Sequence, residues 1–354
     1  MASSTAKQVI DGLRELAAPG RSAAEVFARA DELLRNVLGY DAVCWHTADP
    51  TTGLVTSVVS NDLSMAGFRE AVRMEVWHED IASFAAIRRS GVRAETLSRA
   101  TRGQPERAMR FREQLAPSGF GDELRMVFDT QGGRWGCAAF MRGREHGPFL
   151  GRQRDLADVA ARHIGNALRA CHAAPTWALP ADQAPAMMIL GPSNGLVAAD
   201  QRAQRLLADL ADDSSASLSV PTAFAMVSEH ARRAASGVLA AQVPIRVRTG
   251  DGRWFVLHAS LVDGFADGHV GVVASPASPA ETMPLYLAAF GLTGREQEVA
   301  LQAIRGCDTR EIARVLAMTP YTVQDHLKAV FTKAGVSSRR ALIARIVQGE
   351  LPPE

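Results

Sequence analysis

The C-terminal end of the chain is divided by closely spaced helix start and stop signals, and this feature constrains the fold most. Thr293 precedes Glu296 by three residues, which is the reciprocal capping arrangement that begins a helix, and Gly306 ends that helix. Thr309 is expected to cap a second, short helix, and Thr319 followed by Pro320 begins a third. With a fourth helix over 338–348, the pattern predicts an all-α four-helix unit.

The third of these helices, expected over 320–333, has two different sides. Apolar residues at helical spacing predict its buried side, namely Val323, Leu327, Val330 and Phe331. The opposite side carries Tyr321, Gln324, Asp325 and Lys328. A helix of this kind fits the major groove of DNA, where polar side chains can contact base edges.

Basic residues gather in the same region, although the whole chain has a formal net charge of only +1. Between Lys328 and Gly349 no Asp or Glu interrupts the series of cations, namely Lys328, Lys333, Arg339, Arg340 and Arg345. Any attraction to nucleic acid must therefore come from local clustering of charge.

The run from Leu292 to Val347, about a sixth of the chain, resembles the LuxR-type (FixJ/NarL-like) helix-turn-helix of bacterial regulators. The matching segments are LTGRE, EIA, TPYTV, DHL and KAGV. The resemblance implies that the third helix reads the major groove and that the fourth packs against a second copy. The DNA-binding residues it implies, together with the basic face, are Thr319, Tyr321, Thr322, Gln324, Asp325, Lys328, Lys333, Arg339 and Arg340.

One departure from the family concerns base preference. Many relatives carry Lys or Arg where this chain has Tyr321 or Gln324. A Gln side chain favours adenine edges, so one contact to phosphate or guanine is expected to be replaced by a Gln contact. A homodimer is expected to place two reading helices about 34 Å apart on an inverted repeat of promoter DNA. RNA polymerase is considered as a further partner.

Two proline-rich stretches divide the rest of the chain. Residues 173–186 contain Pro175, Pro180 and Pro185, and the second stretch, 275–286, contains Pro276, Pro279 and Pro284. Because proline at this density interrupts helices and strands, both are expected to be linkers. The sequence thus predicts a multidomain α+β chain with units over 1–172, 187–274 and 287–354.

The first unit is expected to contain a helix, a hairpin, a mixed middle, a second hairpin and a closing helix. Ser22 and Glu25 form a capping box, the hairpins cover 40–60 and 123–142, and the last helix covers 150–172. This order resembles a GAF domain, an α/β sensory module. The closing helix carries an apolar stripe that predicts a dimer seam, namely Leu156, Val159, Ala160, His163, Ile164, Ala167 and Leu168.

The second unit is expected to contain five strands and one helix. The strands cover 187–190, 196–199, 243–249, 254–262 and 269–274, and the helix covers 200–210. This order resembles a PAS domain, another α/β sensory module.

Several aromatic and imidazole side chains of the first unit are candidates for a small-molecule cavity, namely Trp45, His46, Trp77, His78 and Phe84. The alternative, left open by the sequence, is that they fill the core. Cys44 and Cys137 are expected to be buried, unreactive thiols, and His163 and His172 solvated or interfacial rather than haem ligands. No metal or cofactor is expected.

The leading hypothesis is a transcription regulator whose first two units sense a small molecule or partner. No signal peptide or apolar segment long enough to span a membrane is apparent, so a cytoplasmic protein is expected. The alternative is an enzyme, or a protein-interaction platform, that uses the helix-turn-helix for autoregulation. No nucleophile and base stand at recognisable spacing, which favours a non-enzymatic regulator.

Overall fold

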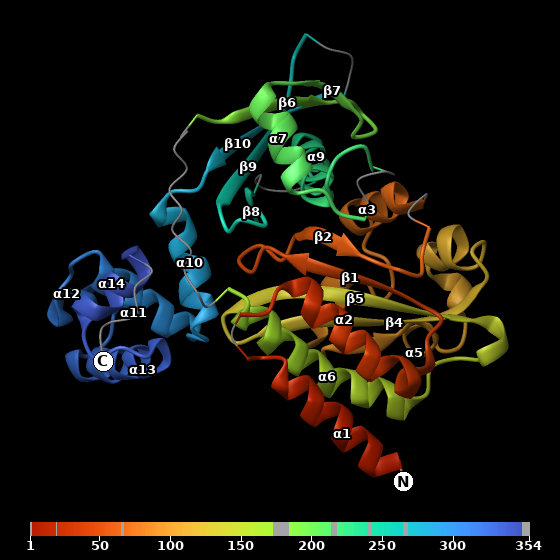
Figure 1. Cartoon of the computed structure of the whole chain (residues 1–354), viewed down its shortest axis with the longest axis horizontal. Coiled ribbons are helices and arrows are strands. Elements are labelled where there is room, and N and C mark those ends of the chain that lie inside the picture. Colours follow the sequence, from red (N-terminus) through yellow and green to blue (C-terminus); the bar gives the residue numbers. More distant parts are fainter. Residues whose placement is uncertain are drawn as a thin grey trace.

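The computed structural model describes residues 2–18, 20–64, 67–172, 184–213, 218–238, 243–264 and 268–348. Two antiparallel sheets lie one above the other, and a bundle of short helices stands to one side of them (Figure 1). We call residues 2–172 the first unit, residues 184–276 the second unit and the helices after residue 278 the C-terminal unit. The predicted linker over 173–186 lies mostly outside the described residues.

The first unit has a five-stranded sheet in the order β2-β1-β5-β4-β3. Its strands are β1 (Ala42–Ala48), β2 (Val55–Val59), β3 (Ala94–Thr96), β4 (Phe120–Thr130) and β5 (Gly133–Gly143). Its α-helices are α1 (Ala2–Glu15), α2 (Ala23–Leu34), α3 (Phe68–Trp77), α4 (Phe84–Ser90), α5 (Leu97–Ala100) and α6 (Gly151–Ala170). Both predicted hairpins, the capping box of Ser22 and the closing helix are confirmed.

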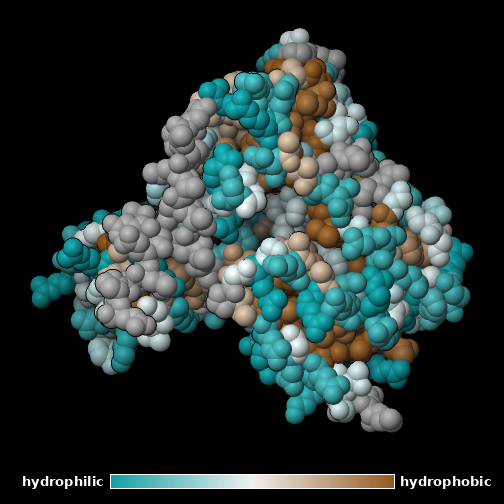
Figure 2. Space-filling model, in the orientation of Figure 1, coloured by the Kyte–Doolittle hydropathy of each residue, from teal (hydrophilic) through white to brown (hydrophobic). Residues whose placement is uncertain are grey.

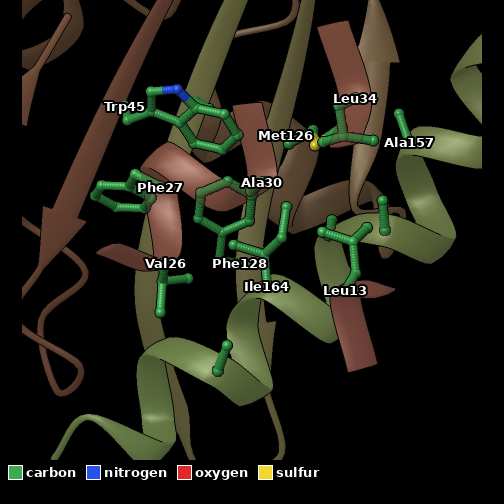
Figure 3. Packing of buried hydrophobic residues seen from close by; sticks show 14 of the residues in the cluster. Leu13, Val26, Phe27, Ala30, Leu34, Trp45, Met126, Phe128, Ala157 and Ile164 are labelled. Atoms are coloured by element: carbon green, nitrogen blue, oxygen red, sulfur yellow. The ribbon is translucent and has the colours of Figure 1, made fainter. Parts of the chain in front are cut away.

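The main core of the first unit lies between one face of this sheet and helices α2 and α6. Phe27 stacks on Trp45 with ring centroids 5.3 Å apart, and Phe128 lies 6.0 Å from Trp45 (Figure 3). Leu13 and Ile164 are completely buried beside them. The core therefore occupies the sheet face that alternate residues of β1, β4 and β5 share.

The closing helix α6 does not have the predicted free seam. Ala160, Ile164 and Leu168 are buried against the sheet, and α6 also packs against α1, which the sequence analysis did not predict. Of the stripe, Val159 remains 48% exposed. The prediction of a dimer seam on this stripe is wrong, because most of its apolar residues form the core.

The second unit repeats the same strand order, β7-β6-β10-β9-β8. Its strands are β6 (Ala186–Leu190), β7 (Leu196–Ala199), β8 (Ile245–Arg248), β9 (Trp254–Leu261) and β10 (Val270–Pro276), and its helices include α7 (Gln201–Asp209) and α9 (Thr222–Ala235). The five predicted strands and α7 are confirmed. Apolar residues remain exposed at the top of the molecule, where β6 and β7 lie, including Met187 and Val197 (Figures 1 and 2).

Helix α9 lies between the two sheets and packs against β9 on one side and against β2 and α3 on the other (Figure 1). The α3 residues Val72 and Val76 belong to the same buried cluster as Phe224 of α9. Polar contacts reinforce this junction, because Trp77 Nε1 donates to Glu229 at 2.8 Å. The first and second units are therefore joined through a shared core.

The predicted linker over 275–286 is wrong as a description of local structure. Strand β10 continues to Pro276, and only two residues separate it from helix α10 (Pro279–Ala289), which contains Pro284. Pro279 occupies the first helical turn, where a missing N–H leaves no bond unmade. Ala288 and Ala289 pack into the core of the first unit, and Leu287 packs into the C-terminal unit. Burial on both sides offsets the bond lost at Pro284.

The C-terminal unit contains the four predicted helices, α11 (Gly294–Ile304), α12 (Thr309–Val315), α13 (Pro320–Ala334) and α14 (Arg339–Gln348), after α10. The Thr293 and Thr319 caps are confirmed, whereas Asp308 rather than Thr309 caps α12. The Asp308 carboxylate accepts from the backbone N–H groups of Arg310 and Glu311, both at 2.8 Å. No helix in the described part of the chain is long and apolar enough to span a lipid bilayer.

Candidate nucleic-acid interface and ligand cavity

The two sides of α13 differ in exposure as the sequence predicts. Val323 and Val330 are completely buried and Leu327 is nearly so, in clusters formed with α11, α12 and α14. Tyr321 is 74% exposed. The other three polar residues on this side of α13, which we call the reading side because it is predicted to face DNA bases, are also exposed, namely Gln324, Asp325 and Lys328. The structure thus brings the four together on one accessible surface.

The start of α13 is fixed by Thr319. Its side chain accepts from the backbone N–H of Thr322 at 3.1 Å, and the two hydroxyl oxygens lie 2.8 Å apart. Because Thr319 is exposed and its partner only half-buried, both hydroxyls stand at the entrance of the reading helix. They can accept or donate further hydrogen bonds there.

Two of the predicted DNA-binding residues are held by contacts within the C-terminal unit. Lys333 Nζ lies 2.9 Å and 2.6 Å from the two carboxylate oxygens of Glu296. Arg339 donates to the carbonyl oxygen of Cys307 at 2.6 Å. Both side chains therefore tie helices together, while Arg340 remains exposed.

A further group of exposed cations, not predicted from the sequence, lies on the other helices. Residues 291–346 contain nine Lys or Arg and five Asp or Glu, so this segment carries a charge of +4. Arg305 follows α11, and Arg310 and Arg314 lie one turn apart on α12, all exposed. The spacing of Arg310 and Arg314, four residues on a predicted helix, was the signal that could have identified them.

A cavity of about 330 Å³ lies on the other face of the first sheet from the core. Its floor includes His46 of β1 and Arg125 of β4, its sides include Phe68 of α3 and Phe84 of α4, and Met226 of α9 forms part of one wall. The second unit therefore contributes to the boundary of a cavity in the first.

The structure places the five candidate ligand contacts differently, and His78 is exposed and does not line the cavity. Successive residues of a strand point to opposite faces, so Trp45 enters the core while His46 faces the cavity. Phe84 also lines the cavity, whereas Trp77 lies at the junction with α9. The candidates Trp45 and Trp77 are thus wrong as cavity residues, and His46 and Phe84 are placed there.

The floor of the cavity holds a buried ionic network. The Glu123 carboxylate is contacted by the guanidinium groups of Arg110 and Arg125, and Arg125 also donates to Glu75 at 2.9 Å. Burial lowers the pKa of His46 to about 3, and the nearby Arg125 acts in the same direction. His46 is therefore neutral at physiological pH, and its Nδ1 is buried with no hydrogen-bond partner in the described part of the chain.

The buried thiols are unreactive by the same physics. Burial raises the pKa of Cys137 to about 12 and raises that of Cys44 further, so neither thiol ionises at neutral pH. The prediction that these two cysteines are buried is confirmed.

Comparisons with known proteins bear mainly on the C-terminal unit. The family described as bacterial regulatory proteins, luxR family, matches residues 291–346. A search of curated proteins gave no match. Among solved structures, SdiA in complex with octanoyl-rac-glycerol is 13% identical, with a TM-score of 0.35 and coverage of 98% of this chain and 94% of that one.

Two further structures are of VqmA. A Vibrio cholerae VqmA dimer in the absence of target DNA is 17% identical over 47% of this chain and 82% of that one, with a TM-score of 0.19. VqmA bound to DPO is 18% identical over 45% and 84%, with the same TM-score. At TM-scores this low, none of these similarities bears on the architecture. The family match, together with helices α11 to α14, identifies residues 291–346 as a luxR-type helix-turn-helix DNA-binding domain.

Proposed function

We propose that this protein is a transcription regulator that reads promoter DNA with α13 and is controlled by its first two units. The observation that carries the proposal is the exposed polar side of α13, with Tyr321, Gln324 and Lys328, on a luxR-type domain. Gln324 would hydrogen-bond an adenine edge, and Lys328 would contact guanine or phosphate.

The phosphate contacts in this proposal come from several helices. The hydroxyls of Thr319 and Thr322, at the start of α13, would donate to phosphate oxygens of the DNA. The exposed Arg310, Arg314 and Arg340 would neutralise neighbouring phosphates. Lys333 and Arg339, which are held within the domain, would act mainly by positioning α13 and α14.

A dimer completes the proposal. A single domain offers few base contacts, so two copies reading half-sites about 34 Å apart would supply the missing discrimination. The dimer surface lies elsewhere than the buried stripe of α6.

The 330 Å³ cavity is the proposed site of an effector. Its volume lies within the range of small-molecule sites, and neutral His46 and half-buried Gln114 each have a buried side-chain nitrogen that lacks a hydrogen-bond partner among the described residues. Such atoms cost about 1–3 kcal/mol each when unsatisfied, so a ligand that bonds to them would bind favourably. Native mass spectrometry, which compares intact and denatured masses, tests whether the purified protein retains a small molecule.

Selection from a pool of random DNA duplexes tests the DNA-binding part. We expect enrichment of an inverted repeat with half-site centres about ten base pairs apart, and affinity that falls steeply with salt as phosphate contacts release counterions. Recovery of random sequences, with no enriched motif at any salt concentration, would contradict the proposal.

A further inference from the structure

A second cavity, of about 320 Å³, lies at the junction of the first and second units. It is bounded by the turn between β1 and β2, by α4 and β5 of the first unit, and by α9 of the second. It adjoins the larger cavity, with which it shares Val55, Glu75, Phe84 and Met226. The first and second units thus enclose it together.

The walls of this second cavity are strongly basic. Four arginines line it, namely Arg88, Arg89, Arg134 and Arg233, against one acidic residue, Glu75. The two carboxylate oxygens of Glu75 already accept hydrogen bonds, one from Arg125 and the other from the backbone N–H of Phe84. The side chains around the second cavity therefore create an excess of positive charge.

The carboxylates next to these arginines neutralise only two of them. Arg88 Nε lies 3.1 Å and 3.0 Å from the carboxylate oxygens of Asp129, and Arg89 forms an exposed pair with Glu79. Arg134 and Arg233 donate only to backbone carbonyls, those of Thr52 and Val76, and have no carboxylate partner among the described residues. Two cations therefore remain without a counter-charge.

Two nitrogen atoms from α9 point to the same conclusion. His230 Nδ1 and Arg233 Nε are both buried without a hydrogen-bond partner in the described part of the chain. They are one helical turn apart on the wall of the cavity. An unsatisfied buried donor is costly, so an acceptor is expected there.

We propose that this junction cavity binds a small organic oxyanion, a carboxylate or a phosphate, with an apolar body. The arginines and His230 would hold the oxyanion, while Leu54, Phe84 and Met226 would contact the apolar part. Because both units supply walls, the bound anion would strengthen their association. The site adjoins the proposed effector cavity and shares Phe84 and Met226 with it, but its arginines and His230 line only the junction cavity.

The charge state of His230 gives an independent readout. Burial, with a contribution from Arg233, lowers the pKa of His230 to about 4, so its ring is neutral in the free protein. An anion beside it would favour the protonated form and raise that pKa.

Isothermal titration calorimetry on the full chain tests the proposal, with benzoate and its uncharged isostere benzamide as probes. Inorganic phosphate at the same ionic strength is the third probe and distinguishes the two oxyanion sources. We expect saturable binding of benzoate or phosphate and none of benzamide. Arg134→Gln should weaken the binding of the oxyanion about tenfold, which is the effect of losing one charge-assisted contact. Arg152→Gln, which removes an exposed arginine of α6 outside the cavity, is the matched control.

The imidazole NMR signals of His230, assigned with His230→Asn, should shift toward the protonated form when the probe saturates the protein. The proposal would be overturned if benzamide bound as well as benzoate, or if neither oxyanion bound saturably. It would also be overturned if Arg152→Gln weakened oxyanion binding as much as Arg134→Gln.

Discussion

Arg246 of β8 joins three parts of the molecule, and replacing it with Met tests the junction between the units most stringently. Its Nη1 lies 3.3 Å from Asp49 in the first unit and 2.9 Å from the Thr51 hydroxyl, and its Nε donates to the Glu281 carbonyl of α10 at 2.8 Å. The Asp49 side chain is completely buried and that of Arg246 is 15% exposed. Met keeps most of the apolar stem of the side chain but removes the charge.

The expected loss of stability follows from this burial. Removing one partner of a buried ion pair typically costs about 3–5 kcal/mol, because the other charge stays buried without compensation. Asp49 would keep the N–H and hydroxyl of Thr51 and the backbone N–H of Arg246, so we expect the lower end, about 3 kcal/mol.

Urea unfolding, followed by tryptophan fluorescence, measures this loss. Trp135 of the first unit and Trp254 of the second flank His172, so their emission reports on the junction. Arg253→Met is the control, since both carboxylate partners of Arg253, those of Asp209 and Asp251, are exposed, and ion pairs to exposed groups contribute less than about 1 kcal/mol. If Arg246→Met lost no more stability than Arg253→Met, the account of a packed junction would be wrong.

Three further outcomes are expected. Burial lowers the pKa of His172 to about 4, below its value near 6.5 in the unfolded chain. The stabilisation from its neutral form is therefore complete above pH 6.5 and is lost as the pH falls toward 4. His172→Asn should reduce this dependence of the free energy of unfolding on pH, measured by urea titrations between about pH 4 and 6.5. Gly132→Ala would bring a Cβ within 2.4 Å of the Leu292 carbonyl oxygen and should speed amide exchange at 292–297, whereas Gly103→Ala, also at positive φ but in open space, should not. Alkylation at pH 8 should modify half-buried Cys307 well before buried Cys44 and Cys137; equal rates would contradict their burial.

The parts of the fold that sequence could predict are those with local chemical signals. The capping side chains of Ser22, Thr293 and Thr319 fixed helix starts, and alternating strands with turn residues between them fixed the hairpins. At α12 two adjacent residues could each have served as cap, and the carboxylate of Asp308 accepts two N–H groups. The neighbour Thr309 therefore becomes the first helical residue.

The elements that the sequence analysis missed owe their stability to tertiary packing. Residues 222–229 of α9 are all buried, so the helix lacks the polar side that reveals an amphipathic period. Helix α10 contains Pro284, which locally opposes a helix, and burial between two cores overrides it. No local pattern reveals contacts between residues this far apart in the chain.

In the candidate sites, too, local spacing could be predicted from the sequence, whereas contacts made by tertiary packing could not. The reading side of α13 follows directly from helical spacing, since neighbours on one face of a helix recur every three or four residues. Lys333 also belongs to a basic run, but its partner Glu296 lies 37 residues away and is brought to it only by the packing of α11 on α13.

The most direct test of the account is retardation of the selected DNA duplex by the double variant Gln324→Ala, Lys328→Ala. Arg295→Ala, Gln302→Ala is the matched control, because it removes one cation and one amide from α11. The account predicts that the first variant keeps its helical circular dichroism but binds selected and scrambled duplexes equally, while the control retains its preference. Undiminished preference for the selected duplex in the Gln324 and Lys328 variant would contradict the assignment of α13 as the reading helix.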